Sequence, residues 1–248
     1  MRRFFFEHTA TYGGGDVITL PASESRHISR VLRLSVGDAV ELLDGQGAVY
    51  SAVLTEVGTS VVAKVISLSH PGEDSLQLIV GQGLLKGKKM DTVVQKCTEL
   101  GVNRFIPFAS SRCQGKLDDL REGKKHDRFH RIVEAACKQC MRPDLMALDR
   151  AADYAAVVEE FSSLPVESSL KLLFWEEEQT RTLHDIEVKD NLERVVILLG
   201  PEGGLTGEEA VLAEQAGFIS VSLGSRILRA ETATLAAVSV VQYMTGNM

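Results

Sequence analysis

Residues 198–209 read Leu198-Leu199-Gly200-Pro201-Glu202-Gly203-Gly204-Leu205-Thr206-Gly207-Glu208-Glu209. An apolar segment ends here in a Gly/Pro turn, and Thr206 with Glu209 forms the capping box that opens a helix. Glycines at the carboxyl end of a parallel strand let backbone approach a ligand closely. An ordinary strand-to-helix turn needs fewer glycines, so the stretch indicates a ligand site in an α/β fold.

A second stretch of the same kind reads Leu223-Gly224-Ser225-Arg226-Ile227-Leu228-Arg229-Ala230-Glu231-Thr232-Ala233-Thr234. It follows an apolar segment and enters a helix. Glu231 suits the positive end of a helix dipole, so a purely structural role would explain it. A cation at a helix N-terminus is disfavoured, which leaves Arg229 without a structural reason. We therefore expect Arg229 to meet an anion.

Outward from these turns, apolar segments of strand length alternate with amphipathic helices. This alternation predicts a mostly parallel sheet covered by helices on both faces. The expected strands are 76–80, 105–108, 170–175, 195–199 and 219–223, and the expected helices are 87–100, 124–141, 152–161, 207–216 and 230–244.

The first 70 residues have a different pattern. Short β-rich segments at 4–6, 17–20, 39–43, 48–54 and 60–66 are separated by glycine-rich turns, and one helix is expected from Ser23 to about Arg33. Short strands of this kind predict a small β-barrel. The run from His70 to Asp74 marks the expected boundary, which gives domains at 1–70 and 74–248.

Charge is unevenly distributed along the 248 residues, whose net charge is −7. Residues 86–142 carry 14 basic and 7 acidic side chains, whereas residues 143–248 carry 7 and 18. The middle third therefore suits a polyanion, although two solvated faces of opposite sign would give the same counts. Two basic sets are candidates for RNA contact: Arg26, Arg30 and Arg33 on one expected helical face, and Lys86, Lys88 and Lys89 after a strand.

Several site classes are excluded or weakened by spacing. Residues 81–89 fail the dinucleotide fingerprint, because Lys86 stands where its third glycine belongs, and this argues against a Rossmann dehydrogenase. Cys137 and Cys140 lie in mid-helix without further metal ligands, so both are expected in the core and no metal is expected. No apolar run could span a membrane and no signal peptide is visible, which predicts a cytoplasmic protein.

Taken together, these stretches resemble the bacterial 16S rRNA uridine N3-methyltransferase family, a branch of the SPOUT methyltransferases. The matching pieces run in the family's order over almost the whole chain, with small departures such as Cys97 where alanine is common. They are Arg26–Arg33, Lys86-Gly87 with Met90, Gln95–Val102, Glu134–Ala136 with Gln139 and Arg142, Gly200–Gly204 and Arg226–Ala233.

The resemblance implies a PUA-like β-barrel over residues 1–70 and a SPOUT α/β domain over residues 74–248, with a trefoil knot that the general rule against knotted chains would not suggest. It also implies a homodimer that uses S-adenosylmethionine to methylate N3 of uridine 1498 in the 16S rRNA of the small ribosomal subunit. The alternative is an RNA-binding module without catalytic activity, in which the glycine turns are only structural.

Site roles follow as expectations. Uracil N3 holds a proton, so methylation requires a base or a cation that stabilises the resulting anion. Arg229 is the expected anion partner, and Glu202 or Glu231 the expected base. The residues expected to bind the cofactor are Phe174, Leu199, Gly200, Gly203, Leu223, Gly224, Ile227, Leu228 and Thr232.

Overall fold

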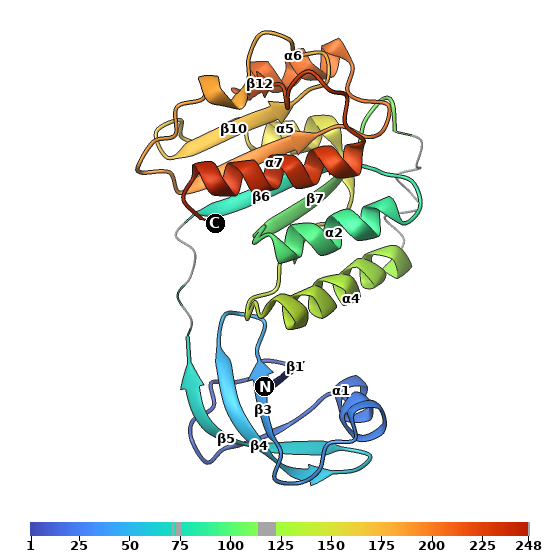
Figure 1. Ribbon diagram of the computed structural model, residues 1–248, viewed down its shortest axis with the longest axis vertical. Coiled ribbons are helices and arrows are strands. Elements are labelled where there is room, and N and C mark those ends of the chain that lie inside the picture. Colours follow the sequence, from blue (N-terminus) through green and yellow to red (C-terminus); the bar gives the residue numbers. More distant parts are fainter. Residues whose placement is uncertain (71, 73–75, 114–122, 248) are drawn as a thin grey trace. The chain divides into compact units, whose positions relative to one another are not determined.

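The computed structural model describes residues 1–70, 72, 76–113 and 123–247. The chain groups into two compact units. One comprises residues 1–73 together with 134–145, and the other comprises residues 74–133 together with 146–248 (Figure 1). None of the helices in the described ranges combines the length and apolar character needed to cross a bilayer.

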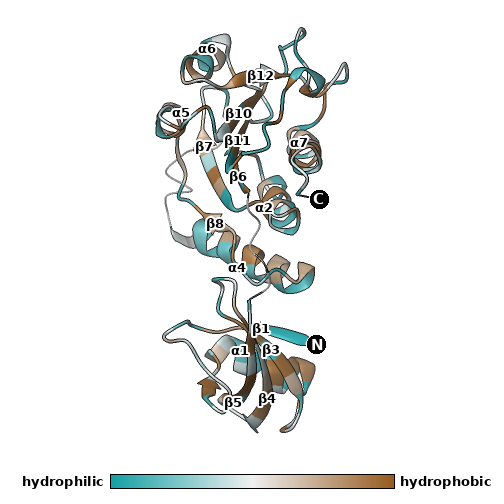
Figure 2. Cartoon of the chain, turned by 90° about the vertical axis from the view of Figure 1, so that its left-hand side faces the viewer, coloured by the Kyte–Doolittle hydropathy of each residue, from teal (hydrophilic) through white to brown (hydrophobic). Residues whose placement is uncertain are grey.

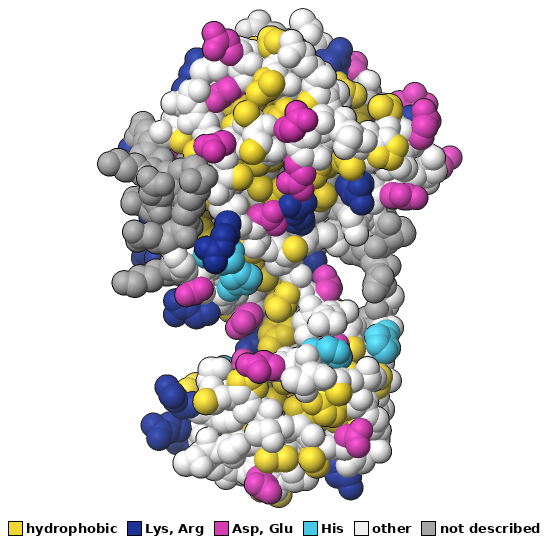
Figure 3. Space-filling view, turned by 180° about the vertical axis from the view of Figure 1, so that it is seen from behind, with side chains coloured by type: hydrophobic (Ala, Val, Ile, Leu, Met, Phe, Trp, Pro, Cys, Tyr) yellow, Lys and Arg dark blue, Asp and Glu magenta, His cyan; other side chains and the backbone are white. Residues whose placement is uncertain are grey.

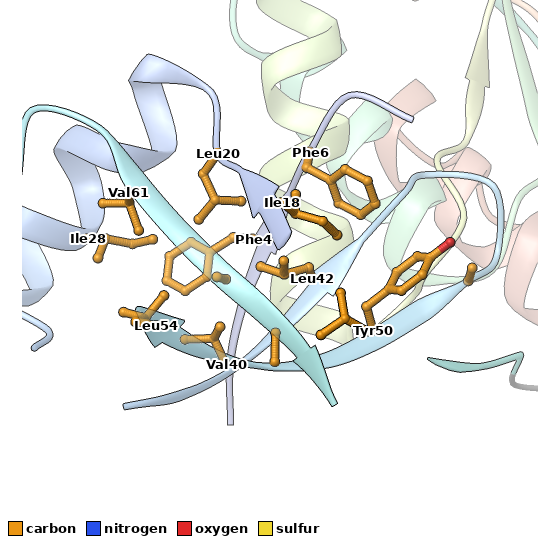
Figure 4. Close-up of a cluster of buried hydrophobic side chains, with 14 residues drawn as sticks. Phe4, Phe6, Ile18, Leu20, Ile28, Val40, Leu42, Tyr50, Leu54 and Val61 are labelled. Carbon is orange, nitrogen blue, oxygen red and sulfur yellow. The ribbon is translucent and has the colours of Figure 1, made fainter. Parts of the chain in front are cut away.

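The N-terminal unit is built on a five-stranded sheet in the order β1-β3-β4-β5-β2. Its strands are β1 (Arg2–Phe5), β2 (Val17–Thr19), β3 (Ala39–Leu43), β4 (Val49–Val57) and β5 (Val61–Ser69). Alternating positions of these strands point inward, and the edge strands β1 and β2 send Phe4 and Ile18 into one shared core (Figure 4). The rings of Phe6 and Tyr50 meet edge to face in that core, with centroids 5.4 Å apart.

The expected helix from Ser23 to Arg33 differs from a regular α-helix. α1 (Ala22–Arg26) continues into a π-helical segment, η1 (His27–Leu32), and Arg33 ends it in a left-handed conformation with φ 53°. A π-helical turn contains more residues than an α-helical turn. Residues three or four positions apart therefore no longer lie on the same face of the segment. Val31, within this segment, is 68% exposed.

The C-terminal unit contains a parallel sheet in the order β12-β10-β11-β6-β7-β8, with β9 also paired to β7. The strands are β6 (Gln77–Gly83), β7 (Arg104–Ala109), β8 (Ala147–Leu148), β9 (Ala152–Asp153), β10 (Ser169–Phe174), β11 (Arg194–Leu199) and β12 (Ile219–Val221). The expected parallel sheet is confirmed, and each expected strand is present within a few residues of its expected ends. The two-residue strands β8 and β9 were not expected.

Helices cover both faces of this sheet, as expected. They are α2 (Lys89–Glu99), α4 (Gly123–Cys140), α5 (Tyr154–Glu160), α6 (Gly207–Gln215) and α7 (Ala230–Met244), with a 3-10 turn, η2 (Leu183–Asp185). Figure 2 shows α2 and α7 on one face and α5 and α6 on the other. The second face is closed by a core that joins β7 and β11 to α5 and α6. Residues of α4 from Glu134 onward group with the N-terminal unit.

The connection after β12 returns the chain from the edge of the sheet toward its middle. β12 pairs with β10 at the edge, yet α7, which follows it, packs against α2 and touches β11. Residues 222–229 therefore cross the carboxyl ends of β10 and β11. This crossing brings three loops together in the C-terminal unit.

Candidate functional site

A pocket of about 1020 Å³ lies where those loops meet, at the carboxyl ends of β10, β11 and β12. Its walls come from residues 174–182, 199–204 and 221–230, with Lys89 of α2 and Ala233 of α7. The volume is that of a small-molecule site, and the carboxyl ends of parallel strands are where open α/β sheets bind ligands. Both glycine-containing turns singled out in the sequence are thus brought to one place.

Nearly all the residues expected to bind a cofactor line this pocket. Those in the lining are Phe174, Leu199, Gly200, Gly203, Leu223, Gly224, Ile227 and Leu228. Thr232 is not among the lining residues and is exposed. Successive residues of a helix are rotated by about 100°, so α7 turns Ala230 and Ala233 toward the pocket and Thr232 away from it.

The turn 200–204 is compact because its glycines leave no side chains in the way. Gly204 has φ +71° and donates from its amide to the carbonyl of Pro201 at 2.9 Å. A Cβ on Gly204 would collide with the Glu176 carboxylate, and a Cβ on Gly83 of β6 would lie 2.5 Å from the Pro201 nitrogen. At Gly83 backbone thus packs on backbone, which only glycine permits, and at Gly204 the positive φ favours glycine.

The loop after β10 flanks the crossing segment on its other side. The Trp175 amide donates to the Val221 carbonyl at 3.2 Å, and the Ser222 amide donates to the Arg181 carbonyl at 2.8 Å. Thr182 and Ser222 also form an isolated parallel bridge. The pocket is therefore held by hydrogen bonds between segments far apart in the sequence.

Glu202 and Lys89, which line the pocket, form a cluster with Glu231. The Lys89 ammonium Nζ lies 3.0 Å from Glu202 Oε1 and 3.6 Å from Glu231 Oε2. The Lys86 backbone amide also donates to Glu202 Oε1, at 3.1 Å. The two carboxylates expected to be candidate bases are therefore brought together by a lysine that had been expected to contact RNA.

These contacts set the protonation of the cluster. Burial opposes ionisation of Glu202, but hydrogen bonds from the Lys86 amide and the Lys89 ammonium outweigh it and lower the pKa of Glu202. The hydrogen bond to Glu202 in turn raises the pKa of Lys89. Glu231 Oε2 is buried and accepts no hydrogen bond from the described residues, so Lys89 at 3.6 Å is its charged neighbour.

Arg229 occupies the N-cap position of α7 and lines the pocket. It is exposed, and it forms no salt bridge with any residue in the described part of the chain. The helix start is a positive environment, so the guanidinium adds to a site already suited to an anion. Arg229 thus lines the pocket, whereas Glu231 is not among the lining residues and is linked to the pocket through Lys89.

One contributor was missed from the sequence. Arg112, just after β7, donates from Nη1 to the carbonyls of Gly203 at 3.3 Å and Leu205 at 3.2 Å. The same guanidinium lies 3.8 Å from Glu176 and 3.6 Å from Glu177. Arg112 thus joins the loop after β10 to the loop after β11. These contacts link residues 64 and 91 positions apart, so a local sequence pattern could not predict them.

The remaining basic residues expected to bind RNA are at the surface. Arg26, Arg30 and Arg33 are exposed in the N-terminal unit, and Lys86 and Lys88 are exposed before α2 in the C-terminal unit. On the face drawn in Figure 3, acidic and basic side chains are interspersed, and no single sign dominates it.

The cysteines bear no sign of a metal centre. No group of three metal-ligating side chains occurs among residues 1–70, 76–113 and 123–247. Cys137 is buried, as expected, and its thiol faces the Asp144 carbonyl at 3.4 Å. Cys140, also expected in the core, is instead only partly buried, because it lies near the end of α4 where the helix surface opens to solvent.

Comparison with known proteins gives two family matches. Residues 72–242 match the model of the RNA methyltransferase domain, and residues 20–66 match that of the RNA methyltransferase PUA domain. Over its length the chain is similar to ribosomal RNA small subunit methyltransferase E of Bacillus subtilis, with 32% identity covering 99% of this chain and 97% of that protein.

Solved structures are similar in the same way. Ribosomal RNA small subunit methyltransferase E from Neisseria gonorrhoeae, bound to S-adenosyl methionine, is 31% identical and superposes with a TM-score of 0.87, covering 98% of each chain. A Legionella pneumophila protein solved with the cofactor SAM bound gives the same identity and TM-score, covering 98% of this chain and 97% of that one.

Proposed function

Because the chain belongs to the RNA methyltransferase domain family, we propose that it transfers a methyl group to N3 of uridine 1498 in the 16S rRNA of the small ribosomal subunit. The observation that carries the proposal is the pocket itself. It joins a glycine turn, an arginine at a helix start and the Glu202–Lys89 ion pair at the carboxyl ends of parallel strands, with Glu231 3.6 Å from Lys89.

S-adenosylmethionine is the cofactor, and it supplies an activated methyl group on a sulfonium. The residues present fit such a ligand. The glycine turn 200–204 offers backbone that a Cβ would obstruct, apolar walls from Phe174, Leu199 and Leu228 suit an adenine ring, and carboxylates at the lining suit a cation. The adenosine is proposed to rest on the backbone of Leu199, Gly200, Gly203, Leu223, Ile227 and Leu228.

The protein's own contribution is to prepare the uracil. Arg229 stabilises the anion that spreads onto the uracil oxygens when the N3 proton leaves. Glu231, two residues after Arg229 in the first turn of α7, is the proposed acceptor of that proton. Glu202 is the weaker base, since its lowered pKa reduces its proton affinity, and it holds Lys89 in place instead.

The fold and assembly implied by the resemblance belong to the same proposal. Residues 1–70 form a PUA-like barrel and residues 74–248 a SPOUT domain whose knot is made by residues 222–229 crossing between the loops after β10 and β11. The hydrogen bonds of Ser222 and Trp175 support this crossing. The active form is a homodimer, and Arg26, Arg30, Arg33, Lys86, Lys88 and Lys89 hold the RNA. N3 lies on the pairing edge, so the target base is unpaired or flipped out.

The test uses small-subunit RNA from a strain that lacks this chain. A methyl on N3 removes the pairing edge of uracil, so reverse transcriptase stops there. The stop at uridine 1498 should disappear in the deletion strain and return when the chain is supplied. A stop that persists without the chain would overturn the assignment. Calorimetry with S-adenosylmethionine separates the enzyme from a binding module without activity, because the module would give no heat.

A further inference from the structure

Gln82 is a completely buried polar side chain at the carboxyl end of the central strand β6. Its neighbours across the sheet are Leu199 on β11 and Pro107 on β7. The next residue, Gly83, has no Cβ, so the turn beginning at Gly200 packs directly on the end of β6. Gln82 therefore lies under the cofactor turn without lining the pocket.

The amide of Gln82 joins two segments. Its Nε2 donates to the carbonyls of Gly83 and Gly200, each at 3.0 Å, and its Oε1 accepts from the Thr234 hydroxyl. The opposite orientation would set Oε1 against two carbonyl oxygens, so the hydrogen-bond pattern fixes the amide. Thr234 is also fully buried and belongs to the first turns of α7, the helix that starts after Arg229.

We infer that Gln82 is a positioning residue that couples the cofactor turn 200–204 to the start of α7, where Arg229 and Glu231 stand. The inference rests on the proposed function of this site. One side chain fixes the Gly200 carbonyl on one side and the Thr234 hydroxyl on the other. Cofactor binding at the turn and the placement of the arginine and the carboxylate thus depend on a single buried amide.

Replacing Gln82 by methionine keeps the volume and removes the hydrogen bonds. The Gly200 carbonyl then loses its buried donor, which is costly for a polar group away from water, and the Thr234 hydroxyl keeps only the Ala230 carbonyl, at 2.9 Å, as its acceptor. We expect the Kd for S-adenosylmethionine, measured by calorimetry, to rise about tenfold. We expect kcat at saturating cofactor to fall by a similar factor, because the start of α7 is also released.

Gln82→Glu adds a second measurement, the pH dependence of the Kd for S-adenosylmethionine, which a purely structural role of Gln82 would leave unchanged. Only the protonated carboxyl can donate to the Gly200 carbonyl, and burial favours that form. The Kd of Q82E relative to the unchanged protein should therefore be near normal in acid and rise about tenfold between about pH 6 and pH 9, as the group ionises against carbonyl oxygens.

Gln242 provides the matched control. It is buried on α7, the helix that also carries Thr234; its Nε2 donates to the Leu100 carbonyl at 2.7 Å, and its Oε1 accepts from Asn247 at 2.8 Å. Q242M and Q242E should lower the Tm as their Gln82 counterparts do, yet leave both the Kd and the pH dependence of the Kd unchanged. If the Gln82 variants behave like these controls, the inference is wrong.

Thr234 keeps the inference testable if Q82M does not fold. Thr234→Val removes the donor to Gln82 and should lower kcat more than cofactor affinity, whereas Thr234→Ser keeps the hydroxyl and should restore kcat. Equal turnover of T234V and T234S would contradict the coupling. Failure of the unchanged protein to bind S-adenosylmethionine would instead overturn the proposed function.

Discussion

Arg229 is the side chain on which the proposed chemistry depends most. Arg229→Ala removes the cation expected to stabilise the uracil anion, and groups of this kind contribute roughly 100-fold to 1000-fold to turnover. We expect kcat at saturating S-adenosylmethionine to fall by at least about 100-fold, while the cofactor Kd changes little. Single-turnover methyl transfer to small subunits measures the first quantity and calorimetry the second. Near-normal turnover would remove Arg229 from the mechanism.

Glu202 offers a test through pH. Its pKa is lowered in the folded chain, so its contribution to stability is present above the ordinary glutamate pKa and is lost as pH falls through the folded value. Glu202→Gln should therefore reduce the free energy of unfolding at neutral pH. The gap between variant and unchanged protein should close below about pH 4.3.

Urea titrations between about pH 3 and pH 7 measure this gap. Glu187→Gln, in an exposed loop position, is the control and should show no comparable trend. A Glu202 difference that stays constant across the range would mean that the hydrogen bonds from Lys86 and Lys89 do not favour the ionised carboxylate.

The sequence singled out an individual side chain where its charge was unfavourable for the element expected to carry it. Arg229 stood out because a helix start disfavours a cation, and it does line the pocket. Lys89 gave no such signal, because its partner Glu202 is 113 residues away along the chain. The sequence shows that a side chain is basic, but it does not show which carboxylate will form an ion pair with it in the folded chain.

At the scale of elements, the turn 200–204 is the feature most sensitive to substitution. Gly204→Ala places a Cβ at φ +71° and against the Glu176 carboxylate, and the left-handed conformation alone costs about 1–2 kcal/mol. We expect a lower Tm and at least about a tenfold loss of affinity for S-adenosylmethionine, since the positive φ strains the turn and the Glu176 carboxylate has to move aside. Differential scanning fluorimetry with and without the cofactor measures both.

Gly207→Ala is the matched control for that substitution. Gly207 begins α6, and a Cβ there would meet nothing within 4 Å. Alanine is also the better helix former, so stability should be unchanged or slightly higher. A similar loss of affinity in both variants would show that the tight packing of the turn is not what matters.

Elements with clear start and stop signals were predicted well. α7 spans 230–244, as expected from its apolar pattern, and the capping box of Thr206 and Glu209 forms at the start of α6. The π-helical segment η1 escaped prediction because apolar periodicity is read against an α-helical spacing. Strands β8 and β9 escaped because two residues carry no measurable period.

At the scale of the whole molecule, residues 134–145 group with residues 1–73 although they follow them by a long stretch of chain. Within that unit Lys138 forms an ion pair with the buried Glu24, and the Leu145 amide donates to the Gly45 carbonyl at 3.1 Å. The sequence predicted a boundary near residue 72. It did not predict that residues 134–145 group with the N-terminal unit, because the contacts that join them link positions far apart in the chain.

This grouping has a consequence for the order of events during synthesis. The N-terminal unit leaves the ribosome first, but the last residues it needs are made 72 positions after residue 73, roughly 4 to 14 s later at 5–20 residues per second. Until then the Glu24 carboxylate has no Lys138 to neutralise it. Nascent chains stalled before residue 134 should be cleaved by protease in their first 70 residues, and chains stalled well beyond residue 145 should resist. Equal protection of both would mean that the early segment completes its fold without waiting for the later one.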